Sequence, residues 1–167
     1  MPPLTLAVNV SAYQFRRSDV SALVTTVLTE TGFPAEQLEL EMTESGLMEN
    51  QKVMALLNDL RALGVRFAID DFGTGYSPLA YLKHFPLDLL KIDKSFIDDI
   101  PHQQDDMEIA ATIIAMGHML GFKVLAEGVE TAEQLAFLQD KGCDIYQGYF
   151  KSKAVPADEF VGLLLEQ

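Results

Sequence analysis

Short apolar runs alternate with amphipathic segments from one end of the sequence to the other. Most of the runs are rich in Val, Ile, Leu or Phe, which is typical of strands buried in a parallel sheet. The predicted strands span residues 6–11, 38–43, 65–71, 88–93, 122–128 and 144–148. Helices are predicted over residues 20–31, 49–63, 105–120, 131–141 and 156–166, with a short one near 77–83. This strict alternation predicts a parallel sheet with helices outside it, in one domain over residues 1–167.

The polar residues within the predicted strands decide between two parallel architectures. Side chains alternate between the two faces of a strand, so one face of each predicted strand is apolar. The other face carries one polar side chain near the carboxyl end of each strand: Asn9, Glu41, Asp70, Lys91, Glu127 and Gln147. A doubly wound sheet is covered by helices on both faces and has little room for these groups. A closed barrel points one face inward and places its active site at the carboxyl ends, so the pattern favours a TIM-like α/β barrel.

Length limits how much of a barrel is present. The chain has 167 residues, whereas a complete eight-unit barrel takes about 250 and rarely fewer than 200. We therefore expect an incomplete barrel of about six βα units. An open barrel leaves strand edges unpaired, and we expect this chain either to be a fragment or to complete itself by dimerisation or strand exchange.

Charge and composition narrow the class of protein. The net charge is −13, which disfavours a DNA- or RNA-binding protein because polymer phosphates need a basic surface. An acidic chain can still bind phosphates through divalent cations. A single cysteine, Cys143, excludes a disulfide framework and suits a reducing compartment, for which we expect the cytoplasm. No run reaches the roughly 20 apolar residues of a membrane span, so no membrane contact is expected from this segment.

The polar side chains on the inward face form a candidate catalytic centre. Converging oxygens from Asn9, Glu41, Asp70 and Asp71 suit Mg²⁺ or Mn²⁺ rather than zinc. Two adjacent aspartates at a strand end can serve two metals, as in-line phosphoryl chemistry often requires. Lys91 can neutralise a phosphate oxygen or position a water, and Glu127 can act as general base. For any one of these residues alone, a helix cap or a solvated surface position is the competing interpretation.

Two further features lie just beyond the strands. The sequence Asp-Phe-Gly-Thr-Gly-Tyr-Ser over residues 71–77 predicts a mobile loop that closes on a ligand, with a simple βα turn as the alternative. Glu44 can anchor that loop by accepting its donors, or can act as a helix N-terminal carboxylate. The three histidines, at 84, 102 and 118, show no metal-ligand spacing, so surface or core roles are expected.

Six motifs in order resemble the EAL domain, the family of bacterial cyclic di-GMP phosphodiesterases. They are Asn9-Val10-Ser11, Glu41-Met42-Thr43-Glu44-Ser45, Asp70-Asp71-Phe72-Gly73-Thr74-Gly75-Tyr76-Ser77, Lys91-Ile92-Asp93, Ala126-Glu127-Gly128-Val129-Glu130-Thr131 and Gln147-Gly148-Tyr149. The resemblance runs from about Leu4 to the C-terminus. It implies a TIM-like barrel that hydrolyses cyclic di-GMP to linear pGpG with Mg²⁺ or Mn²⁺.

The resemblance also implies roles for single residues. Asn9, Glu41 and Asp70 resemble ligands of the first metal, and Asp70 and Asp71 resemble ligands of the second. Lys91 resembles the lysine that holds the attacking water, Glu127 the glutamate that assists it, and Glu44 the glutamate that steadies the loop over residues 71–77. Ser11, Asp93 and Gln147 are expected at the substrate or at the edge of the site. The family resemblance further implies a homodimer, and upstream regulatory or GGDEF-type domains in a parent protein.

One departure bears on activity. The Glu-Ala-Leu segment for which the family is named, whose Glu is a ligand of the first metal, is absent from this chain. We therefore interpret the chain as the C-terminal two-thirds of such a domain, with weak or absent hydrolysis because one metal ligand is missing. The alternative is a non-catalytic module that binds cyclic di-GMP or a protein partner.

Overall fold

Six parallel strands form a single sheet whose spatial order, β1–β2–β3–β4–β5–β6, follows the chain. The computed structural model describes residues 4–17, 19–44, 46, 52–75 and 82–165. The strands are β1 (Leu6–Asn9), β2 (Leu38–Thr43), β3 (Arg66–Phe72), β4 (Leu89–Ile92), β5 (Lys123–Ala126) and β6 (Ile145–Tyr146). The helices are α1 (Ala12–Arg17), α2 (Val20–Thr31), α4 (Lys52–Ala62), α6 (Gln104–Met119), α7 (Ala132–Asp140) and α8 (Ala157–Leu165), with 3₁₀ helices η1 (Ala35–Gln37) and η2 (Lys94–Phe96).

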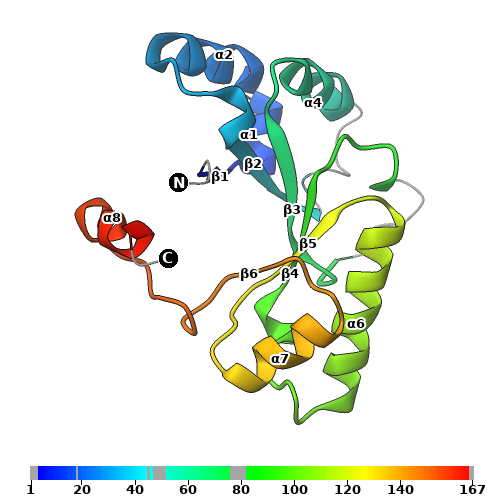
Figure 1. Ribbon diagram of the computed structural model, residues 1–167. Coiled ribbons are helices and arrows are strands. Elements are labelled where there is room, and N and C mark those ends of the chain that lie inside the picture. Colours follow the sequence, from blue (N-terminus) through cyan, green and yellow to red (C-terminus); the bar gives the residue numbers. More distant parts are fainter. Residues whose placement is uncertain (1–3, 18, 45, 47–51, 76–81, 166–167) are drawn as a thin grey trace.

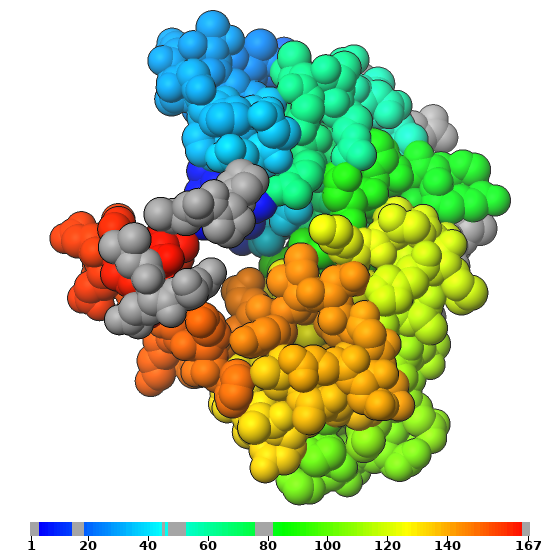
Figure 2. Space-filling model, in the orientation of Figure 1, coloured from blue at the N-terminus to red at the C-terminus, as the bar shows by residue number. Residues whose placement is uncertain are grey.

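The sheet is curled into an incomplete barrel, as the sequence predicts. Helices α2, α4, α6 and α7 lie around its outer side, and α8 stands apart across the open side (Figure 1). The space-filling view shows the molecule hollowed between its blue N-terminal part and its orange C-terminal part (Figure 2). Among the residues that the structure describes, no helix is long and apolar enough to span a bilayer.

Most predicted elements are present with shifted ends, whereas helix α1 and the short 3₁₀ helices η1 and η2 were not predicted. Helix α2 and strand β2 have the predicted bounds, whereas β6 is reduced to two residues. Helix α1 was not predicted, although its signal is in the sequence: Ser11 Oγ accepts the Gln14 N–H at 3.3 Å, and Gln14 Oε1 accepts the Ser11 N–H at 2.9 Å. This is a capping box. The predicted short helix near residues 77–83 falls largely outside the described residues, as does the start of the predicted 49–63 helix.

The two faces of the sheet are packed differently. The outer face meets the helices through a large apolar core that includes Phe67, Ile69 and Leu90, all fully buried. On the inner face, Ala68, Leu89 and Leu125 form a separate small cluster. The alternation of side chains along β3 and β4 therefore separates the two sets as the sequence predicts.

Two aspartates fasten the amino ends of the strands, and we call them the amino-end clamps. Asp88, just before β4, donates its N–H to Phe67 O at 2.9 Å, and its Oδ2 accepts the Phe67 N–H at 3.0 Å. Asp144, just before β6, repeats this arrangement with Val124 at 3.1 and 2.8 Å. Each carboxylate also contacts a basic side chain near the end of a helix: Arg61 pairs with Asp88, and His118 Nε2 lies 2.8 Å from Asp144 Oδ2.

The open barrel leaves apolar surface uncovered beside β1. Leu6 and Val8 of β1 and Leu23 and Val27 of α2 are exposed, and they line an apolar groove of about 340 Å³. Within the described part of the chain, no strand pairs with the outer edge of β1 or of β6. The two ends of the sheet are therefore available for further polypeptide.

Candidate active site

A buried lysine connects four strands at the carboxyl end of the sheet. Lys91 Nζ donates to Glu41 Oε2 at 2.9 Å and contacts Asp70 Oδ1 at 2.9 Å and Glu127 Oε1 at 2.8 Å. Its side chain is only 4% exposed. The three carboxylates come from β2, β3 and the residue after β5, and they converge because parallel strands bring their carboxyl ends to one edge. Three carboxylates around one ammonium leave a partly buried excess of acidic groups.

The lysine remains a cation in this environment. Burial by itself lowers the pKa of Lys91, but the hydrogen bonds to Glu127, Glu41 and Asp70 outweigh it and raise the pKa above its ordinary value of 10.5. The ammonium is therefore charged throughout the neutral pH range. It provides a fixed positive charge close to any ligand that binds to these carboxylates.

A break in the strand register brings two consecutive aspartates to the site. The pairing of β3 with β4 shifts between Ile69 and Phe72, and Asp71 adopts φ 54°. Asp tolerates this left-handed conformation better than most residues. The Asp71 N–H donates to Asp70 Oδ1 at 3.2 Å, and the two carboxylates share one side of the strand instead of alternating.

These carboxylates form a group of a size that suits a metal ion. One carboxylate oxygen from each of Asp70, Asp71 and Glu127 lies within 4.8 Å of the others. Burial raises the pKa of Asp71, and the charges of Asp70 and Asp93 raise it further. Burial likewise raises the pKa of Glu127, although Lys91 opposes the shift. Crowded oxygen donors with raised pKa values gain stability from a hard divalent cation, so the residues present fit such an ion.

Asn9 and Gln147, two further residues predicted at the site, lie on strands or strand ends at its border. Asn9 is paired with Glu41 across β1 and β2, so the two side chains share a face. Asn9 is exposed, because no strand covers its other side among the described residues. Gln147 follows β6, is exposed, and lines a cavity of about 250 Å³ together with Glu127. Register and the shared cavity therefore place both residues beside the site.

Two of the predicted site-edge residues have local partners. Ser11 is engaged with Gln14 in the capping box of α1. Asp93 Oδ1 accepts the Ser95 N–H at 3.0 Å and also binds the Ser95 hydroxyl. Burial works to raise the pKa of Asp93, but the bonds from Ser95 outweigh it and the pKa is lowered. Asp93 is thus a stable anion next to Asp71.

Glu44 reaches the loop that follows β3. It is 5% exposed, and its Oε2 accepts the Gly73 N–H at 3.4 Å. A Cβ at Gly75 would lie 3.1 Å from the same oxygen, so the loop backbone passes directly over the carboxylate. Residues 76 and 77 of the predicted loop lie outside the described residues.

Sequence reasoning missed the role of one buried polar residue. Gln134 forms the capping box of α7 with Thr131, a pairing that the Thr-x-x-Gln spacing indicates. Its amide also bonds two carbonyls in the segment after β4. The capping motif was visible in the sequence, whereas the second set of bonds depends on how two βα units pack together.

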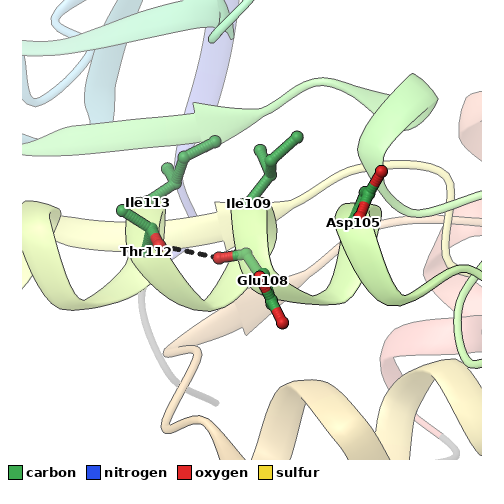
Figure 3. A pocket seen from close by; sticks show the side chains of 5 residues that line it. All are labelled: Asp105, Glu108, Ile109, Thr112 and Ile113. Atoms are coloured by element: carbon green, nitrogen blue, oxygen red, sulfur yellow. Dashed lines mark hydrogen bonds between the residues drawn. The ribbon is translucent and has the colours of Figure 1, made fainter.

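A separate hollow lies along one side of α6, away from this site. It has a volume of about 480 Å³ and is lined by Asp105, Glu108, Ile109, Thr112 and Ile113. Figure 3 shows these side chains along a single helix, with the Thr112 hydroxyl bonded back to the Glu108 carbonyl at 2.7 Å. None of the predicted site residues lines it, so it adds nothing to the candidate active site.

Comparisons with known proteins agree with this geometry. The model of the EAL domain family matches residues 1–154. The cyclic di-GMP phosphodiesterase NbdA of Pseudomonas aeruginosa is 53% identical over 154 residues, covering 92% of this chain and 20% of NbdA. The chain spans about a fifth of the length of the curated relatives it matches.

Solved structures superpose closely as well. The PaMucR phosphodiesterase in complex with c-di-GMP gives a TM-score of 0.89 at 41% identity, covering 93% of this chain and 64% of that one. BlrP1 of Klebsiella pneumoniae, solved with manganese and cyclic di-GMP, gives 0.83 at 32% identity, covering 91% and 39%.

Proposed function

The chain belongs to the EAL domain family, and from this premise we propose that it contributes to the hydrolysis of cyclic di-GMP to linear pGpG with two divalent cations, Mg²⁺ or Mn²⁺. The observation that carries the proposal is the Lys91 ammonium held among Glu41, Asp70 and Glu127 beside the Asp70–Asp71–Glu127 oxygen group. A general base, a fixed cation and metal ligands are the parts that phosphodiester hydrolysis requires.

Each residue has a task in the proposed reaction. Bound cations would supply charge stabilisation to the phosphate and activate water. Asn9, Glu41 and Asp70 would hold the first cation, and Asp70 and Asp71 the second. Lys91 would orient the attacking water, and Glu127 would accept its proton. Water adds to one phosphorus, the bond from that phosphorus to the ribose 3′ oxygen breaks, and the leaving oxygen takes up a proton, giving the 5′-phosphorylated product.

The electrostatics of Glu127 support its role as base. Burial raises the pKa of its carboxyl above the ordinary 4.5, which brings the group closer to the pH at which proton transfer is efficient. Lys91, by contrast, has a raised pKa and would act as a fixed positive charge. The two adjacent side chains thus divide the proton transfer and the electrostatic stabilisation between them.

The other predicted residues border this centre. Ser11, Asp93 and Gln147 would contact the substrate or the edge of the metal site. Glu44 would steady the loop after β3 through its bond to Gly73.

The rest of the barrel would come from other polypeptide. The unpaired edges of β1 and β6 and the apolar groove beside β1 support completion by further residues of a longer protein or by a second copy in a homodimer. A diguanylate cyclase (GGDEF-type) unit is a candidate neighbour, since the related MucR is described as a bifunctional diguanylate cyclase and phosphodiesterase.

We expect hydrolysis by this chain alone to be weak. A stable, well-folded monomer in light scattering would contradict completion by a second copy.

The decisive experiment follows binding and hydrolysis of cyclic di-GMP in the same tube with Mn²⁺. We expect binding together with slow appearance of pGpG. Glu127→Gln should lower the rate by roughly 10²–10⁴-fold, the usual contribution of a general base. Binding without any product, unchanged by Glu127→Gln, would instead indicate a non-catalytic cyclic di-GMP-binding module.

A further inference from the structure

Gln134 uses its whole hydrogen-bonding capacity in a buried position. It lies in the first turn of α7 and is 3% exposed. Its Oε1 accepts the N–H groups of Glu130 at 2.7 Å and Thr131 at 3.0 Å. Its Nε2 donates to the carbonyls of Ile97 at 3.0 Å and Asp98 at 3.3 Å. A primary amide has two donors and two acceptor sites, so all four are occupied.

The four backbone groups belong to two segments that begin at the active site. Residues 127–131 start with Glu127 and lead into α7. Residues 93–98 start two positions after Lys91 and contain η2. The Glu127 N–H donates to Ile92 O at 3.2 Å where the two segments leave the sheet. Gln134 connects the two segments a second time, farther from the sheet.

The two segments are in close contact between these fasteners. Gly128 has φ 70°, and a Cβ at this position would lie 2.4 Å from Lys94 Cγ. A surface ion pair, Lys94 Nζ to Glu130 Oε1 at 2.7 Å, also crosses between them. Both partners of that pair are nearly half exposed, so it constrains the segments weakly. The buried amide is therefore the stronger of the two connections.

We propose that Gln134 is a positioning residue that holds Glu127 at bonding distance from Lys91. It acts through the backbone and touches neither substrate nor metal. Its acceptor oxygen fixes the segment after β5, and its donor nitrogen locks that segment to the segment after β4. The inference rests on the proposed function, because it gives the Lys91–Glu127 pair a part in hydrolysis.

Gln134→Glu separates this role from helix capping. A glutamate keeps the acceptor oxygens that cap α7 but loses both donors, and it repels the carbonyls of Ile97 and Asp98. Gln139→Glu is the matched control, since Gln139 lies exposed on the same helix. Gln134→Met, which removes all four bonds while keeping an unbranched side chain, is the second variant.

The readout is the Lys91 ζ-ammonium signal in ¹H–¹⁵N NMR of the full chain, identified by its loss in Lys91→Arg. We expect Gln134→Glu to shift or broaden this signal, while Gln139→Glu leaves it unchanged. We further expect kcat for cyclic di-GMP to fall by about 10–100-fold, the usual cost of losing an orienting partner, with KM little changed.

Two results would overturn the proposal. One is an unchanged ammonium signal in both Gln134 variants, whatever their stability. The other is failure of both variants to fold, which would make Gln134 a folding determinant only. If the unmodified chain shows no hydrolysis, the proposed function fails, but the ammonium signal still decides whether Gln134 positions Glu127 against Lys91.

Discussion

The two ends of this sheet use similar charged residues for opposite purposes. At the amino end, each clamp carboxylate, Asp88 or Asp144, meets one backbone N–H and one basic side chain. At the carboxyl end, Glu41, Asp70 and Glu127 share the single ammonium of Lys91. At the amino end each carboxylate has its own basic partner, while the excess of carboxylates at the carboxyl end is available to bind a cation.

This difference agrees with a general property of barrel folds. Function collects at the carboxyl ends of barrel strands, and residues at the amino ends serve stability. An acidic residue beside a strand is therefore informative only when its end of the strand and its partners are known. The comparison predicts that substitutions at the two ends separate ligand binding from folding.

The largest effect is expected at Asp70. Asp70→Asn removes one negative charge from the Asp70–Asp71–Glu127 group while keeping the shape of the side chain. We expect Mn²⁺ affinity to fall by more than about 100-fold, beyond the usual loss for an outer partner. The urea midpoint should change little, because crowding among the carboxylates is relieved. The same Asp→Asn change at Asp88 is the control, and equal Mn²⁺ affinities of the two variants would contradict the comparison.

The reverse result is expected at the amino end. Asp88→Ala leaves the buried Phe67 N–H without its acceptor and Arg61 without its carboxylate. We expect a loss of about 2 kcal/mol in the free energy of unfolding, or roughly 4–8 °C in Tm. Mn²⁺ affinity, measured by titration of the folded protein, should stay at the unmodified value. A weakened metal site with unchanged stability would show that the two ends are not independent.

A smaller, pH-dependent effect is expected at Asp144. Burial works to raise the pKa of Asp144, but His118 and the Val124 N–H outweigh it and lower the pKa below the ordinary 3.8. The stabilisation is therefore present above pH 3.8 and is lost as the pH falls through the lowered pKa.

Asp144→Asn tests this sign. It should cost about 1 kcal/mol at pH 7, at the low end for a charged hydrogen bond because the side chain is 34% exposed. Urea unfolding from pH 7 down to about pH 2 should show the difference from the unmodified chain disappearing in acid. A difference that persists at low pH would contradict the assignment.

The smallest effect is expected at the surface pair between Lys94 and Glu130. Both side chains are nearly half exposed, so water screens their attraction. We expect Lys94→Ala to shift Tm by less than about 2 °C, with no effect on Mn²⁺ affinity. A larger shift would mean that the contact between Gly128 and Lys94 contributes more than the charges do.

The sequence predicted the fold well where it depends on short-range patterns. Alternation along the strands placed Phe67 outside and Lys91 inside, because side-chain direction in a strand follows from position alone. The bulge at Asp71 was not predictable, since it breaks that alternation. The amino-end clamps were also missed: Asp88 and Asp144 begin two of the predicted strands, and their bonds appear only when the preceding strand is placed beside them. The residue types were visible in the sequence, but the contacts between residues far apart along the chain were not.

The order of the strands has a consequence for synthesis. Because spatial order equals chain order, each strand leaving the ribosome can pair with the strand made just before it. Glu41 and Asp70 emerge before Lys91, and Glu127 emerges last. Until Lys91 is added, the Glu41 and Asp70 carboxylates would lack the ammonium that they share in the folded chain. Ribosome-bound chains that end before β4 would therefore carry Glu41 and Asp70 without the cation that they share.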